Sequence, residues 1–355
     1  PGRLAGRDGA DGAARDPGRD KKMKTARTAT LAFAFTLIAG AWPASALAQD
    51  ACKNRGTLDA RFCDENGDLI ADLPKDPKQW QNPATLVFSY TPVEDPSVYE
   101  NVFEDLMQHV AKVTGKRVRW YPAESYAAQV EAIRSGRLHI AGVATGPTPY
   151  AVNLAGFEPV ASMTRADGSI GYTLQLITQK DSPIKTVQDL KGKRVAHVSP
   201  SSNSGDTAPR ALFSAMGVVP GKDYEVLFSG KHDNSIMGVV NKDYDAAPVA
   251  STVVERMQAR GMFKADALRV IYETAPFPRT AFGVPHNLAP ELKAKVKEAF
   301  LTFDFKKSRL AKEFKDTERF TAIVYKDSWR DVLTIQKASG VSYTQEALSK
   351  LGTKE

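Results

Sequence analysis

Residues 195–210 read Val-Ala-His-Val-Ser-Pro-Ser-Ser-Asn-Ser-Gly-Asp-Thr-Ala-Pro-Arg, the most informative stretch of the chain. Its apolar start predicts a strand, and Pro209, which suits the first turn of a helix, predicts a helix after it. Between them, Ser201 to Gly205 offer hydroxyls, an amide and backbone N–H groups at a helix N-terminus, where the helix dipole favours an anion. We interpret the stretch as a strand–turn–helix unit for a small oxyanion. Simple helix capping is the alternative.

The same alternation of strand and helix extends on both sides of this unit. Strands are predicted at 85–89, 118–121, 138–143, 194–198, 225–228 and 245–249, with extended chain at 268–284. Helices are predicted at 99–113, 125–135, 209–216 and 235–240, and mainly helical chain from residue 290. Strands that alternate with helices predict an α/β fold of βαβ units. Because the pattern restarts at residue 194, we expect two lobes, each a mostly parallel sheet flanked by helices.

Composition is typical of a globular protein. The chain has 355 residues, of which 42% are hydrophobic and 25% are charged, which allows two domains and excludes a mainly disordered chain. The net charge of +7 is concentrated at the start. Residues 1–48 hold eight Lys or Arg and four Asp or Glu, so the remainder has 40 against 37, or +3. Nucleic acid is therefore not expected as a partner.

The N-terminal sequence predicts export. After Met23, two basic residues precede the apolar and small residues 28–41, and Ala46-Leu47-Ala48 fits a small-x-small cleavage site. We expect residues 23–48 to be a cleaved signal peptide and residues 1–22 to be upstream sequence. The mature protein would then lie in the periplasm without a transmembrane segment. A membrane anchor is the weaker alternative, because the apolar run is short.

Residues 49–83 form a polar, turn-rich N-terminal extension that contains both cysteines. Cys52 and Cys63 follow the expected cleavage site and would be in an oxidising compartment, which predicts a structural disulfide. A metal site with two cysteines is the poorer alternative, because no His lies nearby.

An acidic loop follows Cys63 directly. Side-chain oxygens at Asp64, Asn66, Asp68 and Asp72 have alternate spacing that could converge on Ca²⁺, which takes six to eight oxygen ligands. The loop departs from the EF-hand pattern, since position 12 is Lys75 instead of Glu. An acidic solvated turn is an equally good interpretation. No other cofactor is expected.

Five phrases in order carry a resemblance to a known family. They are Tyr126-Ala-Ala-Gln-Val-Glu-Ala-Ile, Ala166-Asp-Gly-Ser-Ile-Gly-Tyr172, Lys180-Asp-Ser-Pro-Ile184, Ser202-Asn-Ser-Gly205 and Gly230-Lys-His232. Together they resemble the substrate-binding proteins of ABC importers for phosphate, phosphite and phosphonates. The resemblance covers about residues 85–287 and implies a two-lobed periplasmic-binding-protein fold with the ligand cleft between the lobes.

The resemblance also implies site residues and lobe boundaries. Lobe 1 would comprise residues 84–175 and 275–355, and lobe 2 residues 176–274. The implied ligand-binding residues are Ser202, Asn203, Ser204 and His232 from lobe 2 and Tyr126 and Tyr172 from lobe 1. Tyr90 and Thr91 are added because they follow the first strand, and a doubly wound fold binds ligands at the carboxyl ends of its strands.

One departure bears on the ligand. Relatives that bind aminoalkylphosphonates use two carboxylates for the ammonium group, whereas the matching positions here are Thr252 and a residue near Arg279 or Thr280. A buried ammonium group without a carboxylate is costly. Phosphite, phosphate or a simple alkylphosphonate is therefore the expected ligand.

The expected function is that of a non-catalytic receptor. It would close around its ligand and then dock on an ABC permease and ATPase complex. A sensor that docks on a membrane kinase is an alternative. A hydrolase that uses a serine with His232 is a weaker one, because the Gly-x-Ser-x-Gly elbow is absent.

Overall fold

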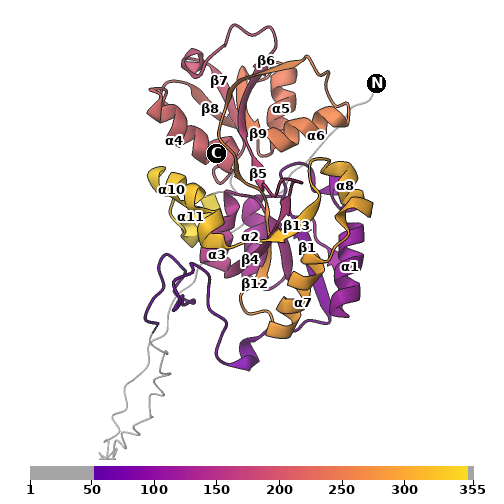
Figure 1. Cartoon of the computed structure of the whole chain (residues 1–355). Helices are drawn as coiled ribbons and strands as arrows, with labels where there is room; N and C mark the ends of the chain where they lie inside the picture. Colours follow the sequence, from indigo (N-terminus) through magenta and orange to yellow (C-terminus); the bar gives the residue numbers. More distant parts are fainter. Residues whose placement is uncertain (1–51, 351–355) are drawn as a thin grey trace, which may run out of the picture. The chain divides into compact units, whose positions relative to one another are not determined.

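Two separate sheets organise the protein in the computed structural model, which describes residues 52–350. The expected signal peptide and the sequence before it lie outside the described residues. The α/β class and the two-sheet architecture are confirmed (Figure 1).

The first sheet has six strands in the order β13-β4-β12-β3-β1-β2. These strands are β1 Thr85–Tyr90, β2 Arg117–Trp120, β3 Ile140–Val143, β4 Phe157–Thr164, β12 Ala281–Pro285 and β13 Arg319–Ala322. The helices around it are α1 Glu104–Thr114, α2 Tyr126–Arg134, α3 Pro147–Ala155, α7 Pro290–Leu301 and α8 Arg309–Glu313. We call this sheet with its helices the six-stranded lobe.

The second sheet has five strands in the order β10-β6-β9-β7-β8. These strands are β6 Leu174–Gln179, β7 Arg194–His197, β8 Glu225–Phe228, β9 Ala246–Ala250 and β10 Leu268–Glu273. Its helices are α4 Ala208–Ala215, α5 His232–Val240 and α6 Ser251–Ala259, and a π-helix, η4 Asn203–Thr207, precedes α4. We call this sheet with its helices the five-stranded lobe.

Each of the two sheets contains antiparallel as well as parallel strand pairs. In the six-stranded lobe β1 pairs in parallel with β2 and β3, but β12 runs antiparallel to both of its neighbours. In the five-stranded lobe β7 pairs in parallel with β8 and β9, but β6 is antiparallel to β9 and β10. Both sheets are mixed because β6 and β12 enter them from the opposite lobe.

The chain crosses between the lobes twice, and the two crossings contact each other. β5 Gly171–Tyr172 lies on the outgoing crossing and pairs antiparallel with β11 Phe277–Pro278 on the returning one. This small two-stranded sheet lies between the lobes, near the centre of Figure 1.

The C-terminal helices are α9 Tyr325–Ser328, α10 Arg330–Ala338 and α11 Gln345–Lys350. Gln336 on α10 donates from Nε2 to the carbonyl of Gly146 in the six-stranded lobe, 2.8 Å away. Just beyond α10, Ser339 donates from Oγ to the carbonyl of Thr207 in the five-stranded lobe at 3.2 Å. The C-terminal segment therefore contacts both lobes.

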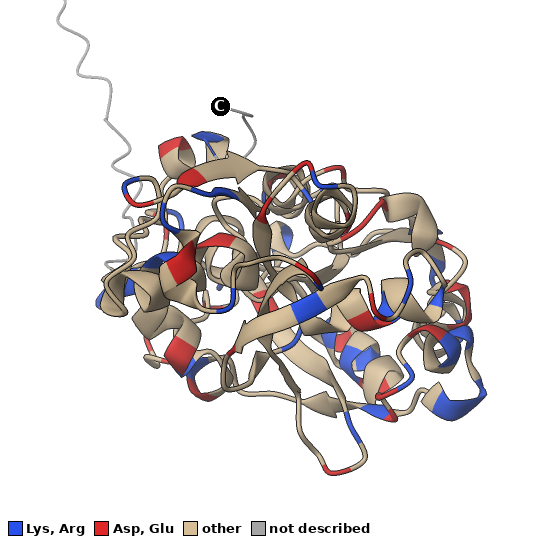
Figure 2. Ribbon diagram, turned by 90° about the horizontal axis from the view of Figure 1, so that it is seen from above, with Lys and Arg blue, Asp and Glu red and all other residues tan. Residues whose placement is uncertain are grey.

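Short 3-10 helices complete the described elements, at η1 Pro77–Gln79, η2 Pro96–Val98, η3 Val187–Leu190 and η5 Phe305–Lys307. Lys and Arg are interspersed with Asp and Glu over the helices and loops (Figure 2). Among residues 52–350, no helix combines the length and apolar character needed to cross a bilayer.

The predicted disulfide is present in the N-terminal extension. Cys52 and Cys63 are bonded, and the loop that they close is fixed to the six-stranded lobe. Asp59 donates from its backbone N–H to the carbonyl of Asn153 at 2.9 Å, and the Phe62 ring lies 4.8 Å from the ring of His286.

The acidic loop after Cys63 is closed by its own backbone. Asp64 accepts N–H groups from Asp68 and Leu69, both at 3.0 Å, and Asp72 accepts one from Glu65 at 2.8 Å. In the part of the chain that the structure describes, no group of three or more His, Cys, Asp or Glu is placed to hold a metal ion. Calcium binding by this loop stays a prediction.

Removing the disulfide tests how it stabilises the extension. A Cys52→Ala and Cys63→Ala double variant should lose about 2–3 kcal/mol of unfolding free energy, because the unfolded chain is no longer restrained by the loop. Calorimetry should then record a melting temperature several degrees lower, since about 1 kcal/mol shifts a domain of this size by roughly 2–4 °C. Ligand affinity should not change, because no residue of the extension lines the cavity described below. An unchanged melting temperature would contradict this account.

Candidate ligand-binding site

A cavity of about 50 Å³ lies between the two lobes. One water needs about 10–15 Å³, so the cavity has room for a group of a few heavy atoms. Its polar lining consists of Tyr90, Tyr126, Thr145, Tyr172, Ser202, Asn203, Ser204, His232, Thr252, Arg256, Arg279 and Thr280. Val93, Met163, Val253 and Phe314 are among its apolar lining. Seven of the eight residues predicted from the sequence therefore meet at one place.

Three tyrosines enter from the six-stranded lobe and the crossing strands. The Tyr90 ring is held by Phe103, with ring centroids 4.6 Å apart, and its hydroxyl lies 3.4 Å from Thr280 Oγ1. Tyr126 begins α2, and Ser125 caps that helix by accepting the N–H of Ala128. The Tyr126 hydroxyl is buried and has no hydrogen-bond partner among the described residues, so it can donate to a ligand.

Tyr172, on β5, is coupled to the polar turn. It accepts a hydrogen bond from Asn203 Nδ2 at 3.2 Å. Its own O–H is then free to donate into the cavity. This contact between a crossing strand and the five-stranded lobe brings two of the predicted residues into one hydrogen-bond chain.

The helix predicted over 209–216 is present as α4, with Pro209 in its first turn. The π-helix η4 precedes it from Asn203, and Ser202 caps η4 by accepting the N–H of Gly205 at 3.1 Å. A Cβ at Gly205 would lie 2.5 Å from the Val198 side chain, so only glycine fits this first turn. The first N–H groups of a helix have no partner within it, and here they belong to Asn203 and Ser204 at the cavity.

His232 presents a defined nitrogen to the cavity. The backbone N–H of Ala250, at the end of β9, donates to His232 Nδ1 at 3.2 Å. Nδ1 is therefore an acceptor, and the proton of the neutral ring is on Nε2. Nε2 lies 3.3 Å from Ser202 Oγ. His232 thus acts as a donor.

Ser202 is left with one free donor. Its Oγ accepts from the N–H of Gly205 and from His232 Nε2, which uses both lone pairs of the hydroxyl. The Ser202 O–H is therefore available to a ligand. A hydroxyl polarised by two incoming hydrogen bonds is a stronger donor than an isolated one.

Burial keeps His232 uncharged. The side chain is 2% exposed, and desolvation lowers its pKa to about 3. Burial likewise raises the pKa of Tyr126, and the neighbouring Tyr172 adds to that shift. The donors supplied by these two side chains are therefore neutral over the physiological pH range.

Two arginines line the cavity that the sequence analysis did not predict as ligand contacts. Arg256, on α6, donates from Nη2 to Glu94 Oε2 at 2.9 Å. Arg279 is paired with Asp316, through Nη1 and Asp316 Oδ1 at 3.1 Å and also through Nη2. Each guanidinium therefore has a carboxylate partner outside the cavity lining.

Three further residues lie outside the cavity lining, and one of them, Thr91, was expected to contact the ligand. Thr91 does not line the cavity, and its Oγ1 is buried without a partner among the described residues. Asp245 accepts the backbone N–H of Arg194 at 2.8 Å, which supports the strand. His139 Nδ1 accepts the N–H of Val87 at 3.1 Å.

Two α/β lobes that enclose a small cavity of hydrogen-bond donors define a solute-binding protein. The chain belongs to the family described as "ABC transporter, phosphonate, periplasmic substrate-binding protein", whose sequence model matches residues 88–328.

Two curated relatives support this assignment. The Phosphate-import protein PhnD of Mycolicibacterium smegmatis is 28% identical over 243 residues, which are 65% of this chain and 75% of the relative. The Phosphonates-binding periplasmic protein of Escherichia coli is 27% identical over 201 residues, which are 56% of this chain and 60% of the relative.

Solved structures share the fold. A binding-protein component of a Pseudomonas aeruginosa phosphonate transporter aligns with a TM-score of 0.66 at 23% identity, covering 75% of this chain and 93% of that one. PhnD1 of Prochlorococcus marinus in complex with methylphosphonate aligns with a TM-score of 0.63 at 18% identity, covering 72% and 98%.

The pH dependence of stability tests the buried neutral histidine. Because the pKa of His232 is about 3 when folded and near 6.5 when unfolded, the unfolded chain binds more protons between these values. The stability linked to His232 is thus complete above pH 6.5 and is lost as the pH falls toward 3. From pH 7 to pH 4.5 the wild type should lose about 2–3 kcal/mol more than His232→Gln in urea unfolding.

His109→Gln is the matched control, because His109 is only partly buried. It should follow the wild type more closely than His232→Gln does. Equal losses of stability in the wild type and in His232→Gln would contradict the assignment of a neutral buried ring.

Proposed function

We propose that the protein is the periplasmic solute-binding component of an ABC importer and binds a small phosphorus oxyanion in the interlobe cavity. Phosphite, phosphate and simple alkylphosphonates are the candidate ligands. Membership of the phosphonate-binding family supports the transport role, and the permease and ATPase of the importer are the partners that this role requires.

The donor set of the cavity is the observation that carries the proposal. Ser202, which accepts a hydrogen bond from His232 Nε2, and Tyr126 offer neutral O–H donors, and the first amides of η4 add the positive end of a helix dipole. Directional neutral donors suit the several oxygens of a tetrahedral anion, and hydrogen bonds to a charged acceptor contribute about 1.5–3 kcal/mol each.

The acceptors around the cavity favour ligands without an ammonium group. No Asp or Glu belongs to the described lining. Glu94, the carboxylate that pairs with the cavity-lining Arg256, also binds Arg260 and Tyr99. An aminoalkylphosphonate would therefore leave its ammonium group buried without a counter-charge.

The orientation of His232 favours binding over hydrolysis. A serine nucleophile needs a neighbouring imidazole nitrogen that accepts its proton. Here Nδ1 is occupied by the N–H of Ala250, so the nitrogen beside Ser202 carries a proton and donates. The low pKa of His232 also makes it a poor base near neutral pH. We therefore propose a receptor without catalytic activity.

A thermal-shift panel tests the ligand class. Phosphite, phosphate or methylphosphonate should raise the melting temperature, because a ligand stabilises the state that binds it. Aminoethylphosphonate should give no comparable shift. Stabilisation by aminoethylphosphonate alone would overturn the proposed ligand class.

Two serine variants locate the site in the same experiment. Ser204 lines the cavity, whereas Ser199 does not, and the Ser199 hydroxyl is buried without a hydrogen-bond partner among the described residues. Ser204→Ala should weaken binding by roughly 10- to 100-fold, the value of one hydrogen bond to a charged ligand. Ser199→Ala should bind like the wild type. Equal affinities of the two variants would place the ligand elsewhere.

A further inference from the structure

A cluster of four buried or partly buried charges joins the two lobes beside the cavity. The six-stranded lobe contributes Glu94, after β1, and Glu313, at the end of α8. The five-stranded lobe contributes Arg256 and Arg260, one turn apart at the C-terminal end of α6. We call these four residues the Glu94 cluster.

Every ion pair in the cluster crosses between the lobes. Glu94 pairs with Arg256 at 2.9 Å and also with Arg260. Glu313 lies 3.5 Å from Arg256 and 3.6 Å from Arg260. Tyr99 of the six-stranded lobe donates to Glu94 and accepts from Arg256 Nη2 at 3.1 Å. Separation of the lobes would break all four ion pairs together.

Two members of the cluster are almost fully buried. Glu94 is 1% exposed and Arg256 is 7% exposed. Burial alone would raise the pKa of Glu94, but the charge of Arg256, the hydrogen bond from Tyr99 and the charge of Arg260 outweigh it and lower that pKa. Both side chains are therefore charged in this arrangement, and removal of either one leaves the other buried with a weaker counter-charge.

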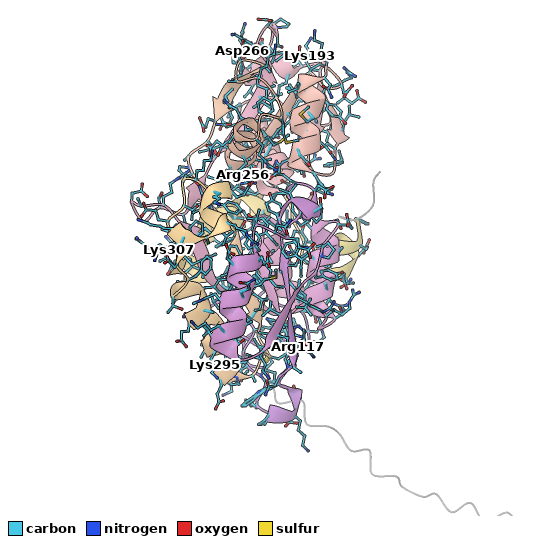
Figure 3. All side chains as sticks on the ribbon, turned by 90° about the vertical axis from the view of Figure 1, so that its right-hand side faces the viewer. Arg117, Lys193, Arg256, Asp266, Lys295 and Lys307 are labelled. Carbon is cyan, nitrogen blue, oxygen red and sulfur yellow. A yellow bond between two sulfur atoms is a disulfide. The ribbon has the colours of Figure 1, made fainter. Side chains whose placement is uncertain are left out.

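Arg256 also reaches the ligand cavity. Its guanidinium lies 5.1 Å from the centre of the Phe314 ring, and both residues belong to the cavity lining. Figure 3 places Arg256 between the two lobes. One cation thus faces Glu94 on the far lobe and the space that a bound anion would occupy.

We propose that Glu94 neutralises Arg256 and so allows the lobes to close while the cavity contains no anion. Glu94 is then a positioning residue for closure rather than a ligand contact. The proposal rests on the proposed function, because it takes the cavity to be an anion site. It implies that without Glu94 a bound anion replaces the lost negative charge beside Arg256 and adds to that of Glu313, so that closure depends on the ligand.

Fluorescence energy transfer between the lobes tests this in the full mature chain. Exposed Asp266 and Lys295, at opposite ends of the two lobes in Figure 3, can be replaced by cysteine and labelled, since both native cysteines are in the disulfide. The wild type without ligand should report a substantial closed fraction. Glu94→Gln should lower the ratio of closed to open protein at least about tenfold, because it leaves the buried Arg256 with Glu313, 3.5 Å away, as its one remaining carboxylate.

Addition of phosphite should close Glu94→Gln again, with a larger change in transfer efficiency than in the wild type. An equal change in transfer efficiency in the wild type and in Glu94→Gln would contradict the proposed dependence of closure on Glu94. Arg260→Gln provides a second variant if Glu94→Gln fails to fold, because Arg260 is the more exposed arginine. Arg260→Gln should also shift the ligand-free protein toward the open state, because it removes two of the four interlobe ion pairs, those with Glu94 and Glu313.

Two controls calibrate the signal. Glu124→Gln removes an exposed carboxylate from an interlobe pair, with the partly buried Lys231 4.0 Å away, and should behave like the wild type. Gly146→Val should hold the lobes apart, because a Cβ at Gly146 would lie 2.1 Å from the carbonyl of Ser201.

The outcomes separate the two proposals. If Glu94→Gln and Arg260→Gln match the wild type without ligand while Gly146→Val is open, the role of Glu94 is wrong and the proposed ligand class is untouched. If both variants open but phosphite, phosphate and methylphosphonate change no signal, the proposed ligand class is wrong and the effect of Glu94 on ligand-free closure stands.

Discussion

The hydrogen bond from the Ala250 amide to Nδ1 of His232 sets the chemistry of the cavity. The Ala250 N–H group lies at the end of the buried strand β9, so the sheet fixes the direction in which this group donates. It places the imidazole proton on Nε2, turns the ring into a donor toward Ser202, and leaves the Ser202 hydroxyl free. A ring that is buried and uncharged can perform this role without adding a charge to the cavity.

The balance of charge around the cavity follows the same logic. Two arginines face the cavity, but Glu94 and Asp316 neutralise them from outside it. The local selectivity for an anion then rests on oriented dipoles, which are the amides of the η4 turn and the hydroxyls of serine and tyrosine. Such groups need no large rearrangement when the ion arrives, because the helix cap and the aromatic packing already hold them.

Much of the site could be predicted because it is local in sequence. The turn at 201–205 joins a strand to a helix, and its residues reach one point whatever the rest of the chain does. The disulfide was predictable for the same reason, since its cysteines are eleven positions apart. The resemblance to a family added His232 and the tyrosines, whose proximity depends on the tertiary fold.

The features that the sequence did not predict depend on contacts between distant parts of the chain. Glu94 and Arg256 are 162 positions apart, so no local sequence pattern indicates that they form an ion pair. One sequence pattern does indicate that Arg256 has a buried partner. Arg256 lies on the apolar face of α6 between buried Val253 and Met257, where an unpaired charge would be unfavourable. The antiparallel direction of β6 and β12 could not be predicted from local sequence, because it depends on where the chain re-enters each sheet.

The C-terminal segment has a consequence for how the molecule moves. It is bonded to Gly146 on one side and to Thr207 on the other, and Figure 1 shows α10 and α8 on opposite sides of the central strands. With one flank tied in this way, the motion available is a swing about that flank. The interlobe cavity would then open beside α6 and α8, which would be the side where a solute enters and leaves.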